Sequence, residues 1–559
     1  MAVLSSRAVP LISSRWGVRA LLVLLLLLTW LSLWSCGRSA DAPANLTRNP
    51  EMITIGTTLK PRTLDPADSY EVASLLLAYN LGETLYTYKP GTTELQPLLA
   101  QALPRLSEDG LTYTIPLRQG VKFHDGTPFD AQAMAFSLQR FMENGGKPSF
   151  LLTDTVAKVA ATSDGELVIT LKKPFAAFPA LLAFPGTAAL SPQAYEIGAG
   201  KFKPDGLVGT GPYRLVSMTN DSLRLAAFAD YWGTPAKNQG IDLQLYPGNP
   251  ANLFNAFRTR AVDVAYQSLV PQQVKQLQAD AQQGQGQVIE APGSVVNFLT
   301  LNLQGETLQN KLVRQAVATL IDRQFLNQRV LQGQGEPVYS LVPTSFAAYQ
   351  PVFQQQYPQQ NLAQAKAWLR QAGYSPEKPA KVEIWHSSGS ITSSIVAALL
   401  KALAKRDLEG MIEFQPNSIA AAAYFKNVSR GLYESAISNW YPDFLDPDNY
   451  LYPFLSCAKG SPQEGCLEGG SQNQGSFYYS KEMNQLLDQE RQTLDPAERQ
   501  AIFAKIQTRL AEDVPYIPLW QSKDFAFAQN DIQGVVINPS QTFPFWTIER
   551  RSQASSGPP

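Results

Sequence analysis

The sequence predicts an α/β fold with more than one lobe, and three observations lead to this prediction. Segments with strand-like and helix-like patterns alternate along the chain. The chain has 559 residues, which is too long for a single hydrophobic core, so two or three lobes are expected. Extended segments occur at both ends of the chain once an N-terminal leader is set aside. Such ends can pair within one lobe while other lobes are inserted between them.

The individual elements follow from the spacing of apolar residues. Residues 51–59 and 111–123 alternate apolar with polar side chains, as strands with one buried face do. Asn361 is expected to cap a helix, and Asp495 and Pro496 to begin another, with Glu498 completing a capping box. The apolar stripes of the expected helices are Met134, Leu138, Phe141 and Met142 after Asp130; Val313, Ala316, Val317 and Leu320 in residues 312–324; and Ile502, Ile506 and Leu510 in residues 495–513.

The first 36 residues have the layout of a secretory signal. Three arginines precede an apolar run over residues 20–34, which is shorter than the roughly 20 residues of a membrane-spanning anchor helix, the alternative interpretation. The following "LWSC" resembles the lipobox of bacterial lipoproteins, in which Cys36 would be acylated and become the mature N-terminus. We therefore expect a signal peptide over 1–35, a small, polar tether over 36–50 and a lipid-anchored protein in the periplasm or at an extracytoplasmic membrane face.

Charge and cysteine content narrow the class of protein further. Without the leader, 43 basic residues stand against 47 acidic ones, and no long block of like charge suggests a nucleic-acid partner. If Cys36 carries lipid, Cys457 and Cys466 remain in a loop-like segment, and an oxidising compartment favours one local disulfide over two free thiols. Two cysteines without nearby histidines make a poor zinc site.

Several sequence strings occur in the order found in one known family. They are "TTLKPRTLDPADS", "LGETLYTY", "LTYTIPLRQGVKFHDGTPFDAQAMAFSLQRF", "GLVGTGPYRL", "DYWG", "AVDVAY", "VRQAVATLIDRQ", "AKAWLRQAGY" and "DVPYIPLWQ". Together they resemble the peptide/nickel-type (family 5) extracellular solute-binding proteins of ABC importers, in lipoprotein form. The match covers roughly residues 52–546.

This resemblance implies an α/β, two-lobed, hinged periplasmic-binding-protein fold (class II, cluster C type) with an extra inserted domain. The implied division is lobe I at 51–85, 205–292 and 519–550, the inserted domain at 86–204, lobe II at 293–518 and a flexible tail at 551–559. The resemblance also implies a monomer without a cofactor that traps a peptide or other small molecule as its lobes close. The closed form would deliver its cargo to an ABC transporter permease.

The segment "NWYPDFLDPDNYLYPFLSC", residues 439–457, places aromatic rings beside three carboxylates. In the peptide-binding branch of the family, its "W-x-x-D" part forms a wall of the ligand site, which here corresponds to Trp440, Tyr441 and Asp443. Asp443 would pair with the α-ammonium group of the ligand, because an ammonium group that leaves water needs a counter-charge. Trp440 would shield this pair and add a cation–π attraction of roughly 0.5–2 kcal/mol. Tyr70 lies where the other lobe of the family reaches the ligand.

The remaining carboxylates of this segment, Asp446 and Asp448, are expected to be turn and helix-capping residues. A calcium loop needs more oxygen ligands at tighter spacing and the glycine and terminal glutamate of an EF-hand, so no metal site is predicted. A packed aromatic loop that touches no ligand is the alternative for the whole segment.

An exported hydrolase is the alternative from another functional class. It would need a positioned nucleophile and base, but the chain has only two histidines, His124 and His386, and no G-x-S-x-G motif. Carboxylate pairs could also serve a hydrolase, although nothing in the sequence singles one out. We therefore predict no catalytic residue.

One departure from the family concerns the carboxylate of the ligand. Dipeptide-binding relatives carry an arginine after the "AGY" helix that holds this carboxylate, whereas this chain has no arginine in that stretch before Arg406. The Ser/Thr-rich residues 386–394 could replace it through hydroxyls, backbone amides or a helix N-terminus, or could leave a longer peptide free to extend. A nickel chelate or another small non-peptide solute is the alternative ligand. His386 could then serve as a ligand to nickel, although a lone histidine is more often structural.

Overall fold

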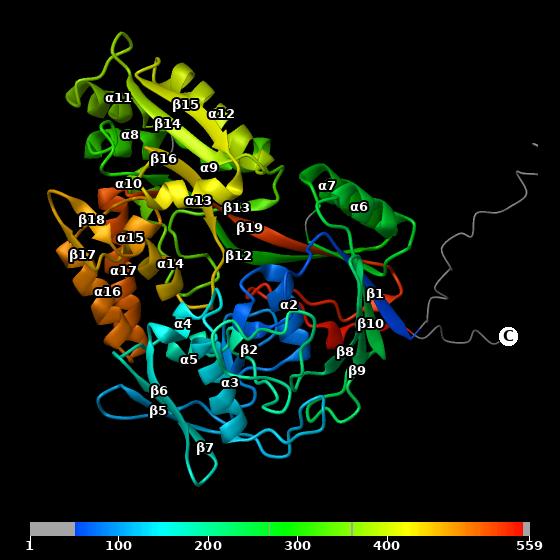
Figure 1. Ribbon diagram of the computed structural model, residues 1–559. Coiled ribbons are helices and arrows are strands. Elements are labelled where there is room, and N and C mark those ends of the chain that lie inside the picture. The colour runs from blue at the N-terminus through cyan, green and yellow to red at the C-terminus, as the bar shows by residue number, and fades with distance from the viewer. Residues whose placement is uncertain (1–50, 268, 359–360, 552–559) are drawn as a thin grey trace, which may run out of the picture. The chain divides into compact units, whose positions relative to one another are not determined.

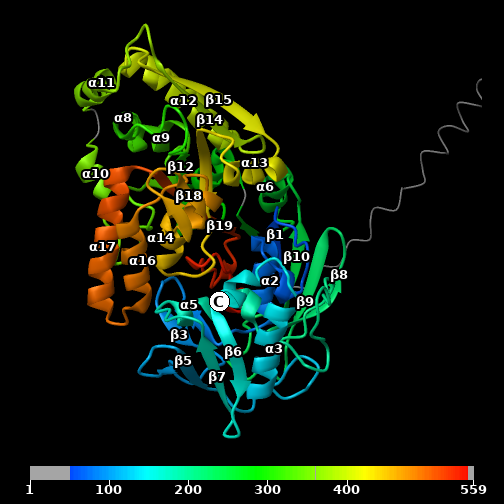
Figure 2. The ribbon, with the colours of Figure 1, turned by 60° about the vertical axis from the view of Figure 1, so that its left-hand side comes forward.

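The computed structural model describes residues 51–267, 269–358 and 361–551, which belong to one compact unit. The expected signal peptide, the tether, Cys36 and most of the expected tail lie outside the described residues. Through the described part runs an eleven-stranded mixed sheet (Figures 1 and 2). Its strands in spatial order are β15 (Ile412–Ile419), β14 (Ala380–Ser387), β16 (Ser435–Trp440), β12 (Gln287–Leu301), β19 (Tyr516–Ala528), β11 (Val264–Tyr266), β1 (Met52–Thr57), β10 (Gly240–Leu245), β9 (Ser222–Ala227) and β8 (Tyr213–Met218), with β13 (Gly335–Pro337) beside β19.

Two lobes share this sheet. We call the part from β11 to β8 lobe I and the part from β15 to β16 lobe II. The antiparallel strands β12 and β19 pass through both, because β12 begins near β11 and ends beside β16. Their pairing is interrupted between Pro292 and Val296. A Cβ atom on Gly293 would lie 2.5 Å from the Ser522 carbonyl oxygen, so the close approach of the two strands at this passage requires glycine.

In lobe I, the prediction of a strand with one buried face at residues 51–59 is wrong in one respect. Strand β1 pairs in parallel with both β10 and β11, and it is buried along nearly its whole length. A parallel strand in the middle of a sheet is covered on both faces, which removes the solvent-facing side that the alternation suggested. The other elements of this lobe are η1 (Pro66–Asp68), α2 (Val72–Leu81), α6 (Pro250–Arg258), α7 (Pro271–Gln282), β20 (Ile532–Gln533), η3 (Phe545–Thr547) and β21 (Glu549–Arg550).

A separate four-stranded antiparallel sheet has its own core, and we call this part the small-sheet domain. Its helix α3 begins after Asp130, whose carboxylate accepts a hydrogen bond from the Ala133 backbone N–H (2.8 Å), as expected of a cap. Of the predicted stripe, Met134, Leu138 and Phe141 are buried, whereas Met142 is half-buried. The elements are β2 (Tyr86–Tyr88), β3 (Leu95–Pro97), β4 (Arg105–Leu106), β5 (Thr112–Pro116), α3 (Ala131–Glu143), α4 (Phe150–Thr153), β6 (Val156–Ala161), β7 (Glu166–Leu171), α5 (Phe178–Leu181) and η2 (Pro185–Thr187). The boundaries drawn from sequence for an inserted domain stay a prediction.

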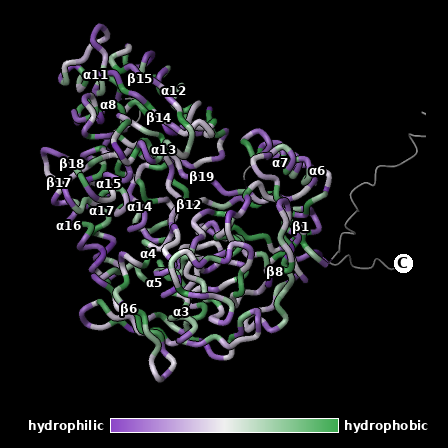
Figure 3. Tube along the Cα trace, viewed as in Figure 1, coloured by the Kyte–Doolittle hydropathy of each residue, from purple (hydrophilic) through white to green (hydrophobic). Residues whose placement is uncertain are grey.

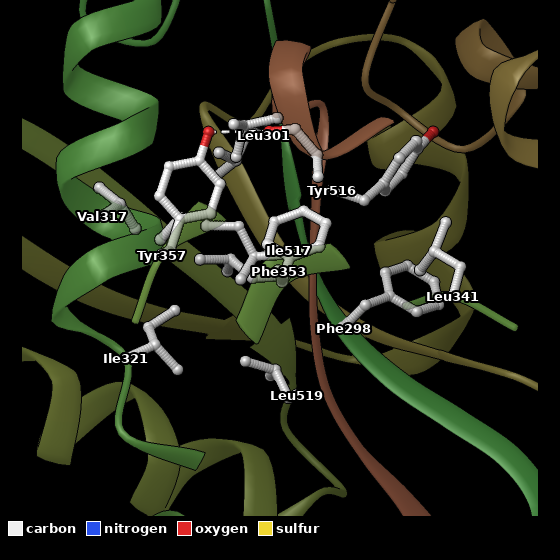
Figure 4. Packing of buried hydrophobic residues seen from close by; sticks show 14 of the residues in the cluster. Phe298, Leu301, Val317, Ile321, Leu341, Phe353, Tyr357, Tyr516, Ile517 and Leu519 are labelled. Carbon is white, nitrogen blue, oxygen red and sulfur yellow. Dashed lines mark hydrogen bonds between the residues drawn. The ribbon is translucent and has the colours of Figure 1, made fainter. Parts of the chain in front are cut away.

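Lobe II contains an extensive hydrophobic core. Figure 4 shows part of it, where Val317 and Ile321 meet Phe353 and the β19 residues Ile517 and Leu519. Its helices and short strands are α8 (Lys311–Leu320), α9 (Arg323–Arg329), α10 (Val352–Gln356), α11 (Leu362–Gln371), α12 (Ile391–Asp407), α13 (Ala421–Ser429), α14 (Asp448–Leu455), β17 (Lys459–Ser461), β18 (Gly465–Glu468), α15 (Gly470–Asn473), α16 (Lys481–Gln492) and α17 (Pro496–Asp513).

Helix α17 begins at Pro496 with the predicted cap, because the Asp495 carboxylate accepts a hydrogen bond from the Glu498 backbone N–H (2.8 Å). Among the described residues the Glu498 side chain forms no bond back to Asp495, so the predicted capping box is not complete. Hydrophilic and hydrophobic residues are mixed along the outer helices, as expected when each helix packs one side inward (Figure 3). Cys466 on β18 forms a disulfide with Cys457, which precedes β17. No helix of the described residues is both long and apolar enough to cross a membrane.

Candidate ligand-binding site

A cavity of about 720 Å³ lies where lobe I, lobe II and the small-sheet domain meet. The four residues singled out from sequence, Tyr70, Trp440, Tyr441 and Asp443, all line it. The other lining residues are Glu71, Val72, Leu75, Leu76, Lys147, Phe184, Pro185, Phe425, Asn439, Pro442, Ser540, Gln541 and Thr542. The structure therefore brings together side chains that lie more than 300 residues apart in the chain.

The position of the cavity follows from the direction of the strands in lobe II. Strands β14, β15 and β16 are parallel, so their carboxyl ends meet at the same edge of the sheet. Trp440 is the last residue of β16, and the loop that follows carries Tyr441 to Asp443. Helix α13, which follows β15, contributes Phe425. Ligands of open α/β sheets bind outside this edge, because the loops there are free to vary while the strands hold them in place.

Asp443 is held from both lobes. From lobe I, the Tyr70 hydroxyl forms a hydrogen bond with its carboxylate. From lobe II, Asn449 accepts a hydrogen bond from the Asp443 backbone N–H (2.9 Å) at its side-chain oxygen, and its amide nitrogen lies 3.4 Å from the Asp443 carboxylate. The same Asn449 oxygen accepts a bond from the Trp440 indole N–H (3.1 Å), so one amide orients two cavity residues.

The carboxylate of Asp443 lies in a poorly solvated environment without a cation. Burial raises its pKa to about 6, although the hydrogen bonds from Tyr70 and Asn449 lower it. No salt bridge among the described residues involves Asp443. Burial, followed by the nearby Asp443 charge, raises the pKa of Tyr70 well above its usual value, so this hydroxyl stays protonated and can donate. Asp443 is thus a carboxylate that lacks a positive partner.

Aromatic rings form much of the cavity wall. The Tyr70 ring makes edge contacts with Phe150 (5.8 Å between centroids) and Phe184 (6.4 Å). The Trp440 ring packs edge-on against Phe454 (5.2 Å), and Tyr441 is half exposed. These packed rings give the cavity apolar walls around the acidic group, in the manner of a small-molecule site.

A second carboxyl group with an unusual environment, Asp524, lies at the passage between the lobes on β19. Its Oδ2 atom is buried and has no hydrogen-bond partner among the described residues, and burial raises its pKa to about 7. Burial and, after it, the charge of Asp524 raise the pKa of Tyr441. The region around the cavity therefore contains two acidic groups that ionise less readily than usual.

The acidic residues that follow Asp443 have another role than expected. Asp446 does accept a hydrogen bond from the Asp448 backbone N–H (2.9 Å), as in a turn. Its main contact, however, is a bidentate pair with Arg499 (2.7 Å for both bonds), and Asp448 pairs in the same way with Arg491 (2.7 and 2.8 Å). These pairs tie the cavity loop to helices α16 and α17, and no sequence pattern indicated them.

The other candidates from sequence do not line the cavity. His386 is buried in β14, where its Nδ1 atom lies 3.0 Å from the Ser387 carbonyl oxygen, and His124 lies 3.0 Å from the Gly211 carbonyl oxygen through Nε2. Both are structural in this arrangement. The Ser/Thr-rich residues 386–394 are also absent from the lining.

Comparison with known proteins places these features in a family. The sequence model of the bacterial extracellular solute-binding proteins, family 5 Middle, matches residues 94–462 of this chain. The chain belongs to the family 5 bacterial extracellular solute-binding proteins. Among curated relatives of this solute-binding protein, the glutathione-binding protein GsiB of Salmonella typhi is 28% identical over 532 residues, which cover 92% of this chain and 97% of GsiB.

Solved structures agree with this two-lobed α/β fold. HbpA2 from Haemophilus parasuis superposes with a TM-score of 0.77 at 23% identity and covers 90% of the solute-binding protein and 100% of HbpA2. The periplasmic binding protein DppA from Helicobacter pylori, solved in complex with the peptide STSA, gives a TM-score of 0.71 at 25% identity, with 90% and 98% of the two chains covered. The fold predicted from sequence is confirmed.

Several residues of the site were not predicted from the sequence of the solute-binding protein. Phe184 follows an ordinary apolar run, and Lys147 follows two glycines in a turn. Phe425 is an aromatic side chain that is 59% exposed on a helix, which is unusual and typical of a binding surface. This exposure is visible only in the structure, so the sequence did not indicate it. Asn449 carries no signal either, since an asparagine in the first turn of a helix is common.

Proposed function

We propose that this solute-binding protein captures short peptides between its lobes and delivers them to the permease of an ABC importer. The proposal rests on the environment of Asp443 at the cavity. Its carboxylate is poorly solvated, has no cationic partner and accepts a hydrogen bond from Tyr70 of the facing lobe. In this proposal the α-ammonium group of the peptide supplies the missing positive charge.

The physical chemistry of an ammonium group supports this assignment. Its transfer from water into a closing cleft is costly unless a carboxylate pairs with it. A charge-assisted hydrogen bond to Asp443 provides this pairing, and it strengthens as the lobes exclude water. Trp440 at the end of β16 and Tyr441 directly after it line the same cavity, where their rings can cover the pair and add cation–π attraction.

The size of the cavity and the relatives point in the same direction. A volume of about 720 Å³ falls in the range of sites that bury small ligands, roughly 300–1,000 Å³. One relative is named for glutathione, and one solved structure contains the peptide STSA. Peptides of a few residues are therefore the ligand class that we propose. The same proposal includes a binding protein without enzymatic activity that acts as a monomer and is held at the membrane by lipid on Cys36.

Native mass spectrometry of the purified protein from its own host tests the proposal. We expect a family of peptide masses on the wild type and on the control Glu413→Gln, which changes an exposed carboxylate on β15. The variant Asp443→Asn keeps the shape of the side chain but removes its charge, so the peptides should be lost. A single non-peptide or metal-containing mass that survives in Asp443→Asn would refute the proposal.

A further inference from the structure

The ionisable side chains of the cavity wall differ in whether they already have hydrogen-bond or ion-pair partners within the protein. Apart from tyrosines, they are Glu71, Lys147 and Asp443. The Glu71 carboxylate accepts hydrogen bonds from the backbone N–H groups of Arg62 (3.1 Å) and Tyr70 (3.2 Å), and the Arg62 guanidinium lies 3.7 Å away. Glu71 is therefore satisfied within lobe I, which leaves Asp443 and Lys147 as the charges available to a ligand.

The backbone at Lys147 is fixed on the wall of the cavity. A Cβ atom on the preceding Gly146 would lie 2.0 Å from the Ala67 carbonyl oxygen, so the turn packs directly against η1. The Lys147 backbone N–H donates to the Asp68 carboxylate (3.2 Å), and three residues later Phe150 contacts the Tyr70 ring. The turn that carries Lys147 is thus joined to the segment that carries Tyr70.

The ammonium group of Lys147 has no hydrogen bond or ion pair within the described part of the chain, and the side chain is exposed. The Asp68 carboxylate, which accepts a bond from the Lys147 backbone N–H, is already paired with the Arg62 guanidinium (2.6 Å). No arginine is among the residues that line the cavity. Arg406, the first arginine after the helix α11, pairs with Asp407 (2.5 Å) and is not one of the lining residues.

We propose that Lys147 binds a carboxylate of the ligand, while Asp443 binds its ammonium group. This inference rests on the proposed function and adds to it a residue that determines specificity. The cavity then offers one unpaired acid from lobe II and one unpaired base from the small-sheet domain. Such a pair fits a ligand that carries both an ammonium group and a carboxylate. Lys147 would then hold the carboxylate in place of the arginine that this chain lacks. The carboxylate is either the terminus of the peptide or an acidic side chain.

Competition among peptide libraries, read by native mass spectrometry, tests this assignment. One library consists of tripeptides with free carboxyl termini, the second of the same tripeptides as C-terminal amides, and the third of amides that each contain one glutamate. The proteins are the wild type, Lys147→Met, Lys147→Arg and the control Lys158→Met, which removes the same charge from an exposed position on β6 of the same domain. Because both lysine side chains are exposed, each variant should fold, and thermal denaturation checks this.

We expect the wild type and Lys158→Met to prefer free acids over amides by roughly tenfold, the scale of one hydrogen bond to a charged group. Lys147→Met should bring the two libraries close to parity, and Lys147→Arg should retain most of the preference. If glutamate-containing amides bind as well as free acids and lose this advantage in Lys147→Met, the carboxylate is that of a side chain. If only free acids are favoured, it is the terminus.

Two results would overturn the assignment while the proposed function stands. One is an undiminished preference for free acids in Lys147→Met, and the other is no preference for acids in the wild type. If no library binds to the wild type at all, the proposed function fails and this assignment fails with it.

Discussion

At the scale of single residues, the site depends on what surrounds Asp443. Three features of this residue act together: burial, a hydrogen bond from Tyr70 and the absence of a cation. The carboxylate is held ready for a positive group, because the folded protein itself does not neutralise it. Sequence supplied the identity of this residue through the family motif, but its raised pKa could not be predicted, since burial depends on how the two lobes pack.

The raised pKa of Asp443 predicts a pH dependence of peptide binding. Above about pH 6 the carboxylate is ionised and can pair with an ammonium group, and as the pH falls through 6 it takes up a proton and loses this ability. We expect the affinity at pH 5 to be roughly tenfold lower than at pH 7.5, as linkage requires for a group with this pKa. Isothermal titration calorimetry at a series of pH values measures this.

The variant Asp443→Asn is the control for that experiment, because it should bind weakly at every pH and show a nearly flat profile between pH 5 and 7.5. An equally steep profile in this variant would assign the titration to another group. An affinity of the wild type that rises on acidification would contradict the ammonium pairing.

At the scale of elements, the loop after β16 is held by helices that follow it in sequence. Asp446 and Asp448 are paired with Arg499 of α17 and Arg491 of α16, and the Glu490 carboxylate lies 2.9 Å from Arg499. Burial and the neighbouring Asp448 charge raise the pKa of Glu490 well above its usual value. The network fixes the loop that carries the cavity residues.

Removal of one arginine should therefore affect both stability and binding. The change Arg499→Met leaves the partly buried Asp446 and the buried Glu490 without their partner, and we expect the free energy of unfolding to fall by roughly 3–5 kcal/mol. Peptide affinity should also fall, because the loop with Asp443 loses its support. Chemical denaturation and calorimetry on the same variant measure the two effects.

A matched control lies on the same helix. Arg509 of α17 pairs with the exposed Glu482 and Glu512 and with the partly buried Asp513, and it is more exposed than Arg499. Its replacement by methionine should cost clearly less than that of Arg499, about 1 kcal/mol, and leave binding unchanged. Similar losses of stability in the two variants would show that the buried network has no special role.

Local features of these elements could be predicted from the sequence, whereas contacts between distant segments could not. Helices such as α17 were predicted correctly, because capping residues and apolar spacing act within a few turns of the chain. The arginine partners of Asp446 and Asp448 lie 53 and 43 residues further on, and pairs at such separations leave no local pattern. Strand β1 was misjudged for the same reason, since its second buried face depends on strands far away in sequence.

At the scale of the whole molecule, β12 and β19 pass from one lobe into the other, and the cavity is lined by residues of both lobes. The family resemblance predicted two lobes and four residues that line the cavity. The residues that the sequence offered for the carboxylate of the ligand, 386–394, are not among the lining residues. Lys147 belongs to a part of the chain that packs against η1 and faces lobe II across the cavity. A single lysine in a turn has no distinguishing pattern, so only the assembled structure could point to it.

A crystal structure of the protein with a peptide bound shows directly which group meets Asp443. We expect the peptide in the cavity between the lobes, with its ammonium nitrogen about 2.7–2.9 Å from the Asp443 carboxylate, the distance of a charge-assisted hydrogen bond. Trp440 should cover this pair. A ligand bound elsewhere, or one that presents an uncharged group to Asp443, would refute the pairing of Asp443 with an ammonium group.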